Sequence, residues 1–416
     1  MDFASRYLAA KAISTPLFEG IPEKDTAIII IIPAFDEAGI IITLNSLLNC
    51  AKPPCSVELI VLLNAPGHAS SAQLEQNDRT GRELYERERE NSNSFIRLLW
   101  HDTGRMPPGW GVGMARKMAM DEALRRFSSI DKPEGVIVSL DADCTVSSAY
   151  LVELYERLYK TNHQACSVYF EHPLEGDMPA DVYKAIIQYE LHLRYYYRSL
   201  KYTGYPWVFH TLGSAIAVKA AHYARAGGMS KRTGAEDFYF IQKLVPAGGY
   251  FYLNTTVVKP SPRVSLRVPF GTGPAINSML AGKQDDYMSY NPAAFSVLQQ
   301  FFDGVKDYYS QDISSVNELS SGFNPGLLEF LKINSWQDKL RVIGDNTSSQ
   351  ESFVKRFFTW FNMFRIVKYL NFVHAQGYHE RVPVTEAATA MLRLSGVKQE
   401  AQDAKELLTI YRQLER

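Results

Sequence analysis

The chain has 416 residues, enough for two domains or for one large domain with an appendage. Its composition is 46% hydrophobic and 21% charged, which is ordinary for a folded globular protein and argues against disordered and fibrous classes. The formal net charge is −1, and this argues against nucleic acid as a partner, because binders of duplex nucleic acid carry a strong basic excess.

Cysteine usage and the apolar runs indicate a cytoplasmic protein. Cys50, Cys55, Cys144 and Cys166 form no CxxC pair and no zinc-ligand spacing, so we expect reduced thiols. The N-terminal stretch has an early acid and no continuous apolar core, so we expect no signal peptide. The longest apolar run, 27–32, is far shorter than the roughly 20 residues that span a bilayer. Any membrane contact is therefore expected to be peripheral, at the inner face of the membrane.

Segments rich in β-branched residues alternate with segments of helical periodicity through roughly the first 270 residues. The predicted strands are 27–32, 57–63, 95–100, 135–140, 165–170 and 213–218. The predicted helices are 38–48, 72–90, 112–127 and 147–158. Strands that are apolar throughout and separated by helices indicate an α/β fold with a mainly parallel sheet. Ligands of such sheets bind beyond the carboxyl ends of the strands.

The strand patterns stop near residue 274, and three later segments have helical periodicity. These segments are 292–309, 353–376 and 386–414. The expected organisation is an N-terminal helical segment (1–25), an α/β domain (26–273) and a helical C-terminal region (274–416). The almost wholly polar segment 73–93 predicts an exposed helix with paired opposite charges.

The segment GVIVSLDADC places Asp141 and Asp143 at the carboxyl end of a predicted apolar strand. Two like charges this close favour a bound cation or a hydrogen-bonded ligand. Mg²⁺ and Mn²⁺ prefer oxygen ligands and are held by one or two carboxylates together with substrate phosphates. The alternative is that Asp143, Thr145 or Ser147 caps a helix that begins near Ser148.

The first predicted strand ends in a similar way, with the segment IIIIIPAFDEAG. Pro33 cannot donate to the strand ladder, so we expect the strand to end there. Asp36 and Glu37 follow, and one interpretation is a rim that contacts a nucleoside through backbone N–H groups and an acid. The other is a helix N-terminus, at which acids offset the helix dipole.

The segment GWGVGMARKMA places three glycines before a helix that carries Arg116 and Lys117 in its first turns. Exposed N–H groups and two cations make a plausible neighbour for a diphosphate. The pattern is neither a Walker loop nor a dinucleotide-binding fingerprint.

The segment GAEDFYF begins another helix with Glu236 and Asp237, after a basic loop that contains glycine. A carboxylate here could accept a proton from an acceptor hydroxyl, or it could offset the helix dipole. Further on, Arg263 and Arg267 precede a Gly-Thr-Gly turn. They would stabilise the charge of a departing diphosphate or remain surface cations.

An aromatic helical segment contains Tyr195, Tyr196 and Arg198. One interpretation is core packing with a solvated basic face, and the other is a platform for an acceptor, because rings stack on sugars and cations meet phosphates. His172 and His210 could be ligands of a metal or substrate, although structural histidines are more common.

Taken together and in this order, PAFDE, GVGMARKMA, SLDADC and GAEDFYF resemble the motifs of the family 2 glycosyltransferases, which have the GT-A (Rossmann-like) fold. The resemblance covers roughly residues 26 to 270. It implies transfer of a sugar from a nucleotide-diphosphate donor, a UDP- or GDP-sugar, to the hydroxyl of a glycan, a lipid-linked or a small-molecule acceptor. It also implies dependence on a divalent metal, inversion at the anomeric carbon, and a place in the biosynthesis of cell-surface glycans or glycoconjugates.

The resemblance also implies roles for single residues of the donor site. Pro33, Phe35 and Glu37 match the loop that contacts the nucleotide base. Asp141 and Asp143 match the acid pair that binds the ribose and the metal, Mg²⁺ or Mn²⁺.

On the acceptor side, Asp237 matches the base that deprotonates the acceptor, with Glu236 beside it. One departure affects the base pocket, because Asn64 and Gly67 stand where the family has an Asp-Asp-Gly-Ser run. An asparagine can still donate to and accept from a base edge. No Gln-x-x-Arg-Trp motif follows GAED, so a non-processive enzyme is expected.

Two other functions stay open at this point. A sugar-phosphate nucleotidyltransferase also uses a metal with nucleotide phosphates, although it usually has a glycine-rich basic loop after the first strand. A catalytically silent module that binds a nucleotide-sugar would share the fold and lack the chemistry.

Overall fold

The computed structural model describes residues 2–90, 94–231, 235–265, 271–282, 286–311, 320 and 322–416. The chain divides into two compact units. The first unit contains residues 1–176, 211–274 and 416, and the second contains 177–210 and 275–415. The first unit holds the main sheet and all the described residues of the candidate site, and the second is mainly helical.

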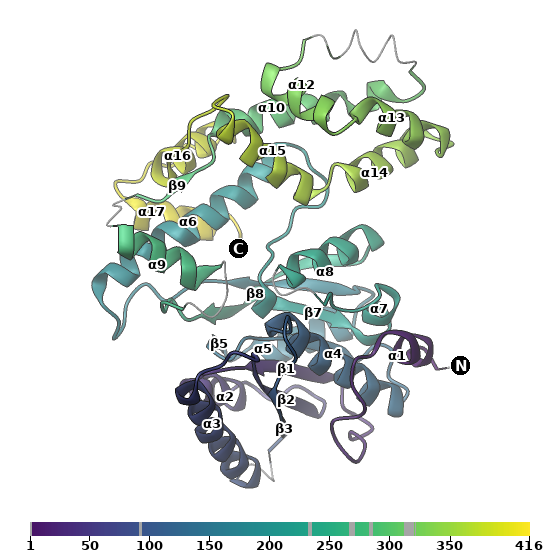
Figure 1. Cartoon of the computed structure of the whole chain (residues 1–416), viewed down its shortest axis with the longest axis vertical. Helices are drawn as coiled ribbons and strands as arrows, with labels where there is room; N and C mark the ends of the chain where they lie inside the picture. The colour runs from purple at the N-terminus through teal and green to yellow at the C-terminus, as the bar shows by residue number, and fades with distance from the viewer. Residues whose placement is uncertain are drawn as a thin grey trace. The chain divides into compact units, whose positions relative to one another are not determined.

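The first unit is built on an eight-stranded sheet with the order β3-β2-β1-β4-β7-β6-β8-β5 (Figure 1). The strands are β1 (Ile28–Ala34), β2 (Val57–Ala65), β3 (Ile96–Arg105), β4 (Val136–Ser139), β5 (Cys144–Val146), β6 (Ala165–Phe170), β7 (Ile216–Lys219) and β8 (Tyr250–Pro260). Strands β3, β2, β1 and β4 are mutually parallel, and β6 is parallel to β8. Strands β7 and β5 run antiparallel to their neighbours. The sheet is therefore mixed and mainly parallel, and the predicted α/β fold class is confirmed.

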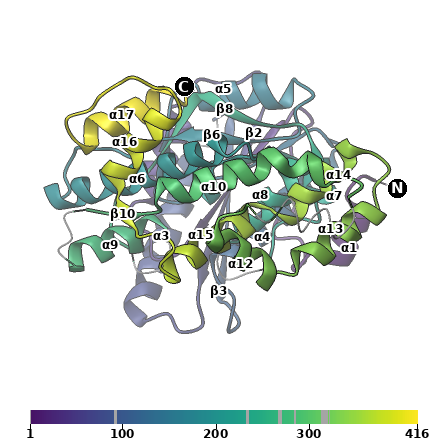
Figure 2. The same ribbon diagram turned by 90° about the horizontal axis from the view of Figure 1, so that it is seen from above.

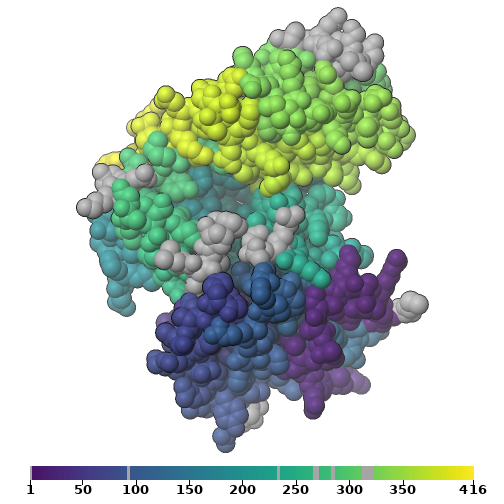
Figure 3. Space-filling model, in the orientation of Figure 1, coloured from purple at the N-terminus to yellow at the C-terminus, as the bar shows by residue number. Residues whose placement is uncertain are grey.

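The composition of the central strands explains their position. All seven residues of β1, which begins with five isoleucines, are buried, and so are all nine residues of β2. Strands that are apolar on both faces need helices on both sides. The helices of this unit are α1 (Ser5–Lys11), α2 (Ile40–Leu48), α3 (Ser71–Glu90), α4 (Val112–Ser129), α5 (Tyr150–Leu154), α7 (Ala220–Arg225) and α8 (Glu236–Leu244). Helix α4 packs on β1, β2 and β4, and the N-terminal segment (purple in Figure 3) lies against α4.

The connections create a switch point in the sheet. From β1 the chain moves outward to β2 and β3, and it then returns to β4 on the other side of β1. In open α/β sheets a ligand binds outside the carboxyl ends of the strands at such a point. The segments that follow β1 and β4 carry the two acidic motifs identified in the sequence.

The second unit consists mainly of helices. They are α6 (Ala180–Tyr202), α10 (Pro292–Asp303), α12 (Pro325–Ile333), α13 (Trp336–Asp345), α14 (Gln350–Trp360), α15 (Met363–Ala375), α16 (Val384–Leu394) and α17 (Ala404–Gln413). Helix α9 (Thr272–Gly282) spans the division between the units. The two-residue strands β9 (Met288–Ser289) and β10 (Val382–Pro383) pair antiparallel. Helix α6 packs along α16 and α17 (Figure 2).

The contacts of α6 favour the core-packing interpretation of its aromatic residues. Tyr195 is 0% exposed, and its hydroxyl donates to the carbonyl of Tyr290 at 2.8 Å. A ring enclosed in this way cannot stack on a sugar, so the acceptor-platform interpretation is wrong for this residue. In the described part of the chain, no helix has the length and apolar content needed to cross a bilayer.

Several element boundaries differ from the sequence predictions. Strands β5 and β8 were not predicted. The segment 213–218 begins with a 3₁₀ turn (Gly213–Ala215), and the helix expected at 147–158 starts at Tyr150 and ends as a π-helical turn (Tyr155–Tyr159). Further 3₁₀ turns are Val245–Ala247 and Gly304–Tyr308. The end of the predicted polar helix, 91–93, lies outside the described residues.

Candidate functional site

Several of the predicted site residues lie at one edge of the sheet. Glu37 follows β1, Asp141 and Asp143 follow β4, and Arg263 follows β8. These three strands run in the same direction, so the residues after them emerge at the same edge. Gly213 precedes the antiparallel β7 and therefore lies at this edge as well.

Arg116 of α4 joins two acids across this edge. Its Nη2 donates to Asp141 Oδ1 at 2.9 Å, and its Nε donates to Glu236 Oε1 at 3.3 Å. Its Nη1 donates to Ser139 Oγ at 2.6 Å and to the Gly213 carbonyl at 2.9 Å. Burial disfavours the charged guanidinium, but Asp141 and Glu236 outweigh this effect and hold the pKa of Arg116 above its usual value. Arg116 is only 4% exposed, and its guanidinium is bonded to both acids. It therefore holds Asp141 and Glu236 in place.

Gly213 is a site residue that the sequence analysis did not identify. A Cβ at this position would lie 2.9 Å from Arg116 Nη2 and 3.1 Å from Asp237 Oδ2. These short distances leave no room for a side chain without displacing the guanidinium. They also show that Asp237, in the first turn of α8, lies beside Arg116.

Arg263 joins a second pair of acids. Its Nε and Nη2 donate to Asp143 Oδ2 at 3.0 and 2.9 Å, and its Nη2 also pairs with Glu37 Oε2. Burial raises the pKa of Glu37 to about 7; Arg263 opposes this shift, and Asp143 adds to it. The side chains of Arg263 and Asp143 keep 28% and 27% exposure, so this pair, unlike Arg116, is open to solvent.

Asp237 is a buried carboxylate whose pKa lies near neutral pH. Burial and the neighbouring Glu236 raise the pKa of Asp237 to about 7, and Arg116 opposes them. Its Oδ1 accepts a hydrogen bond from the backbone N–H of Phe238 at 2.7 Å. A general base is most effective when its pKa lies near the working pH.

Asp141 and Asp143 form a donor set that suits a hard cation. Their side chains are 38% and 27% exposed and present carboxylate oxygens at the strand end. Within the described ranges, no group of three or more His, Cys, Asp or Glu residues is placed to hold a metal. Two carboxylates match the donor set that Mg²⁺ takes from a protein when phosphates and water complete its shell.

The remaining predicted donor residues lie on or next to the first two strands. Pro33 lies within β1, Phe35 follows it, and Asn64 lies in β2. The Asn64 carbonyl accepts from Asn77 Nδ2 of α3 at 3.0 Å. Arg267 lies outside the described residues.

The helix-cap interpretation is wrong for the acids after β4, whereas Glu37 after β1 does contact the start of a helix. Helix α5 has Ala149 as its N-cap, with no side-chain hydrogen bond to the helix end. Helix α2 begins at Ile40, with Gly39 as its N-cap, and Glu37 Oε1 accepts from the Gly39 N–H at 3.2 Å. Capping thus does not explain the acids after β4, whereas Glu37 contacts the helix start with one carboxylate oxygen and Arg263 with the other.

Lys117 does not accompany Arg116 at the acidic edge. Its Nζ donates to the hydroxyl of Tyr7 at 2.7 Å and to Asp121 Oδ2 at 2.9 Å. Burial lowers the pKa of Lys117, and Asp121 opposes the shift. This buried cluster ties α1 to α4, so Lys117 is not available to a diphosphate at the edge.

The two histidines have structural surroundings. His172 is buried, with its Nε2 3.5 Å from Thr272 Oγ1. His210 is buried in the second unit, with its Nε2 3.0 Å from Glu415 Oε2. These contacts favour a structural role for both.

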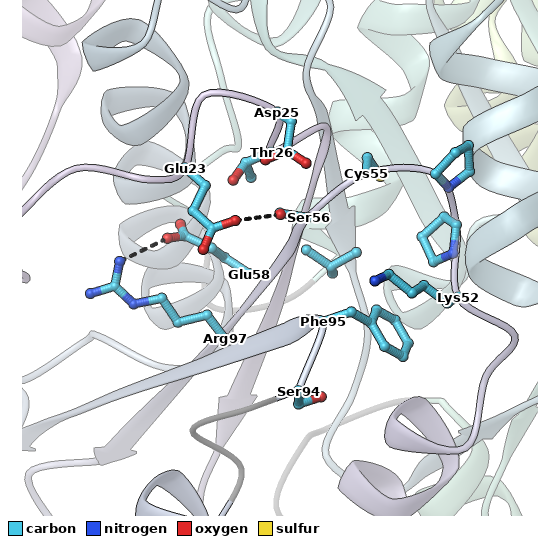
Figure 4. A pocket seen from close by; sticks show the side chains of 13 residues that line it. Glu23, Asp25, Thr26, Lys52, Cys55, Ser56, Glu58, Ser94, Phe95 and Arg97 are labelled. Carbon is cyan, nitrogen blue, oxygen red and sulfur yellow. Dashed lines mark hydrogen bonds and ion pairs between the residues drawn. The ribbon is translucent and has the colours of Figure 1, made fainter.

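A cavity of about 460 Å³ lies at the opposite edge of the sheet, before the amino ends of β1, β2 and β3 (Figure 4). Its wall includes Glu23, Lys52, Phe95 and Arg97, and the Ser56 hydroxyl donates to Glu23 there at 2.6 Å. None of the predicted site residues lines it. The cavity is therefore separate from the acidic carboxyl edge.

No family model matches the chain, and no curated protein matches it. Among solved structures, it is similar to residues 1–349 of S. aureus TarS, with 15% identity over 56% of this chain and 60% of that chain and a TM-score of 0.38. The same part of TarS in complex with UDP-GlcNAc is 14% identical over 93% of this chain and 90% of that chain, with a TM-score of 0.40. GalNAc-T7 with UDP, GalNAc and Mn²⁺ is 12% identical over 72% and 54%, with a TM-score of 0.36.

Proposed function

We propose that the chain is a glycosyltransferase that moves a sugar from a nucleotide-diphosphate donor to an acceptor hydroxyl. One observation carries the proposal: five acids and two arginines from distant parts of the sequence gather at the switch-point edge of an α/β sheet. These residues are Glu37, Asp141, Asp143, Glu236, Asp237, Arg116 and Arg263. Such an edge can bind a charged diphosphate and can also supply a base.

Different residues of the chain have different proposed roles in the reaction. A divalent cation, Mg²⁺ or Mn²⁺, held by Asp141 and Asp143, would neutralise the charge of the leaving diphosphate. Asp237 accepts the proton of the acceptor hydroxyl on a carboxylate oxygen, and the negative charge of Glu236 beside it favours that uptake. Arg116 holds Asp141 and Glu236 at fixed positions, so it acts as a positioning residue.

The residues proposed to bind the nucleotide-sugar donor lie at the same edge of the sheet. Pro33, Phe35 and Glu37 form the rim for the nucleotide base, with Asn64 on the next strand. Arg263 is partly exposed, and we propose that it binds a phosphate of the donor; we assign Arg267 the same role.

The proposal also includes a family, a catalytic domain, a stereochemical outcome, substrates and a location in the cell. We propose membership of the family 2 glycosyltransferases, with residues 26–273 as the GT-A catalytic domain, inversion at the anomeric carbon and a single transfer per encounter. The proposed donor is a UDP- or GDP-sugar, and the acceptor is a glycan, a lipid-linked or a small molecule in the biosynthesis of surface glycans or glycoconjugates. We place the protein in the cytoplasm, with any membrane contact peripheral.

A panel of nucleotide-sugars tests the proposal. Thermal unfolding is measured with each donor in Mg²⁺, in Mn²⁺ and in chelator, and donor hydrolysis is then measured for any donor that stabilises the protein. We expect metal-dependent stabilisation by at least one donor and slow hydrolysis that Asp237→Ala abolishes. Release of pyrophosphate from a nucleoside triphosphate and a sugar phosphate would instead identify a nucleotidyltransferase. Metal-dependent donor binding without hydrolysis or transfer would identify a silent binding module.

A further inference from the structure

One face of helix α3 is directed toward the loop after β1. Gln73, Asn77 and Thr80 lie at positions i, i+4 and i+7, which share a face of a helix. Gln73 Nε2 donates to Asp36 Oδ2 at 3.3 Å, and Thr80 Oγ1 donates to the Glu37 carbonyl at 3.2 Å. The rest of α3 is highly charged and mostly exposed, so this polar face is distinct from its solvated surface.

Asn77 makes the most specific of these contacts. Its Oδ1 accepts from the backbone N–H of Asp36 at 2.9 Å, and its Nδ2 donates to the carbonyl of Asn64 at 3.0 Å. The side chain therefore bridges the backbones of two adjacent parallel strands just beyond their last paired residues, Ala34 and Leu63. Asn77 is 4% exposed, which makes both bonds costly to lose.

The loop needs such support because of its backbone conformation. Asp36 has a φ of 51°, in the left-handed region that non-glycine residues rarely adopt. Residues in this region persist only where their surroundings hold them. The bond from the Asp36 N–H to Asn77 fixes the peptide at this point, immediately before Glu37.

We propose that Asn77 is a positioning residue for the base rim, here defined as residues 33–37, and that it sets the affinity for the nucleotide without taking part in transfer. This inference rests on the proposed function, because the rim is assigned to the nucleotide there. Asparagine suits the task because its amide donates and accepts like a backbone peptide group. Aspartate would keep the acceptor and lose the donor, and alanine would lose both.

The test compares Asn77→Asp, Asn77→Ala and Thr80→Val with the full-length wild type. We expect Asn77→Ala to raise the donor KM about tenfold, with kcat within about twofold of wild type. The rim that binds the nucleotide base is loosened in this variant, whereas the proposed general base, Asp237, is untouched. Thr80→Val should give a smaller increase in KM. Asn77→Asp should give an increase at least as large as Asn77→Ala, because its buried carboxylate would face the Asn64 carbonyl. Amide hydrogen exchange of the peptide that contains Asp36 should speed up in Asn77→Ala, in the absence of any ligand. Asp78→Ala, an exposed neighbour on α3, is the control and should change neither quantity.

The outcomes separate this inference from the proposed function. A fall in kcat with an unchanged KM, or unchanged exchange at Asp36 in a folded Asn77→Ala protein, would overturn the role of Asn77. If Asn77→Ala does not fold, Asn77→Asp and Thr80→Val give the same readouts. Failure of the wild type to bind any nucleotide would overturn the proposed function and the nucleotide part of this inference. The exchange measurement would still report whether Asn77 fastens the loop.

Discussion

The two arginines of the site, Arg116 and Arg263, differ in their exposure to solvent. Arg116 is buried and contacts Asp141, Glu236, Ser139 and a carbonyl, so it holds the acids in a fixed arrangement. Arg263 is partly exposed and lies on Asp143, one of the two carboxylates proposed to bind the metal. A cation that enters this site therefore competes with a guanidinium already present on Asp143.

We expect Arg263→Ala to bind Mn²⁺ more tightly than wild type in the absence of nucleotide, by about tenfold, because an opposing positive charge is removed from Asp143. Free Mn²⁺ measured by electron paramagnetic resonance during a titration gives this affinity. Arg263→Lys keeps the charge and is the matched control. Unchanged or weaker Mn²⁺ binding by Arg263→Ala would show that Arg263 does not compete for this site.

The pKa of Asp237 gives a pH prediction for the reaction. A general base works only when it is deprotonated, and burial raises the pKa of Asp237 to about 7. We therefore expect kcat to rise with pH through about 7 and then to level off. The pKa of Glu37 is also about 7, so the profile is measured again in Glu37→Gln, where the rise in kcat should persist. A kcat that is independent of pH across this range would remove Asp237 from the role of base.

At the scale of elements, a buried ion pair joins α4 to β2. Arg126 donates to Glu58 through Nε at 2.5 Å and through Nη2 at 2.6 Å, and both side chains are almost fully buried. Without Arg126, the buried Glu58 keeps only the half-exposed Arg97, whose Nη1 lies 3.7 Å from Glu58 Oε1, so most of the compensation of its charge is lost. The pair therefore matters for keeping α4, which carries Arg116, in place on the sheet.

We expect Arg126→Met to lower the free energy of unfolding by about 3–5 kcal/mol, as is typical when one partner of a buried ion pair is removed. The double variant Glu58→Gln with Arg126→Met should lose less, because no unpaired charge remains. Urea unfolding of the three proteins measures both values. A double variant that is less stable than Arg126→Met would show that Glu58 remains compensated without Arg126, and would contradict this prediction.

The sequence predicts the elements better where the local pattern is strong. The run of isoleucines in β1 and the apolar run in β2 were identified because strands buried on both faces read as continuous apolar segments. Strand β8 was missed because its residues alternate irregularly between buried and exposed positions. The three-residue β5 is too short to produce any pattern.

The candidate site could be identified in part. Asp141 and Asp143 stand out because acids follow an apolar run, and that context is visible in the sequence. The pairing of Arg263 with Glu37 joins residues 226 positions apart, and no local pattern indicates it. Gly213 and Asn77 were missed for the same reason: a glycine and an asparagine are ordinary residues until the fold places them against Arg116 and Asp36.

At the scale of the whole molecule, the helical unit contains a histidine that should make its stability depend on pH. His192 Nδ1 lies 2.8 Å from Ser289 Oγ. Burial, and to a lesser extent Arg381, lower the pKa of His192 from 6.5 to about 4. The unfolded chain therefore binds a proton at a higher pH than the folded chain does.

It follows that this histidine lowers folding stability as the pH falls from 6.5 toward 4 and has no such effect above that range. We expect the urea midpoint of the wild type to decrease over this interval more steeply than that of His192→Gln. Circular dichroism at several pH values gives both curves. Parallel curves for the two proteins would show that His192 is not protonated on unfolding.

The central claim is that the acids at the carboxyl edge of the sheet divide into a metal-binding part and a base. It is tested most directly by titration calorimetry and transfer assays on Asp143→Ala and Asp237→Ala, with the donor that stabilises the wild type. We expect Asp143→Ala to lose metal-dependent donor binding. Asp237→Ala should bind the donor within about threefold of wild type and lose at least about a hundredfold in kcat, as expected for loss of a general base. Donor binding that survives in Asp143→Ala, or transfer that survives in Asp237→Ala, would contradict the account.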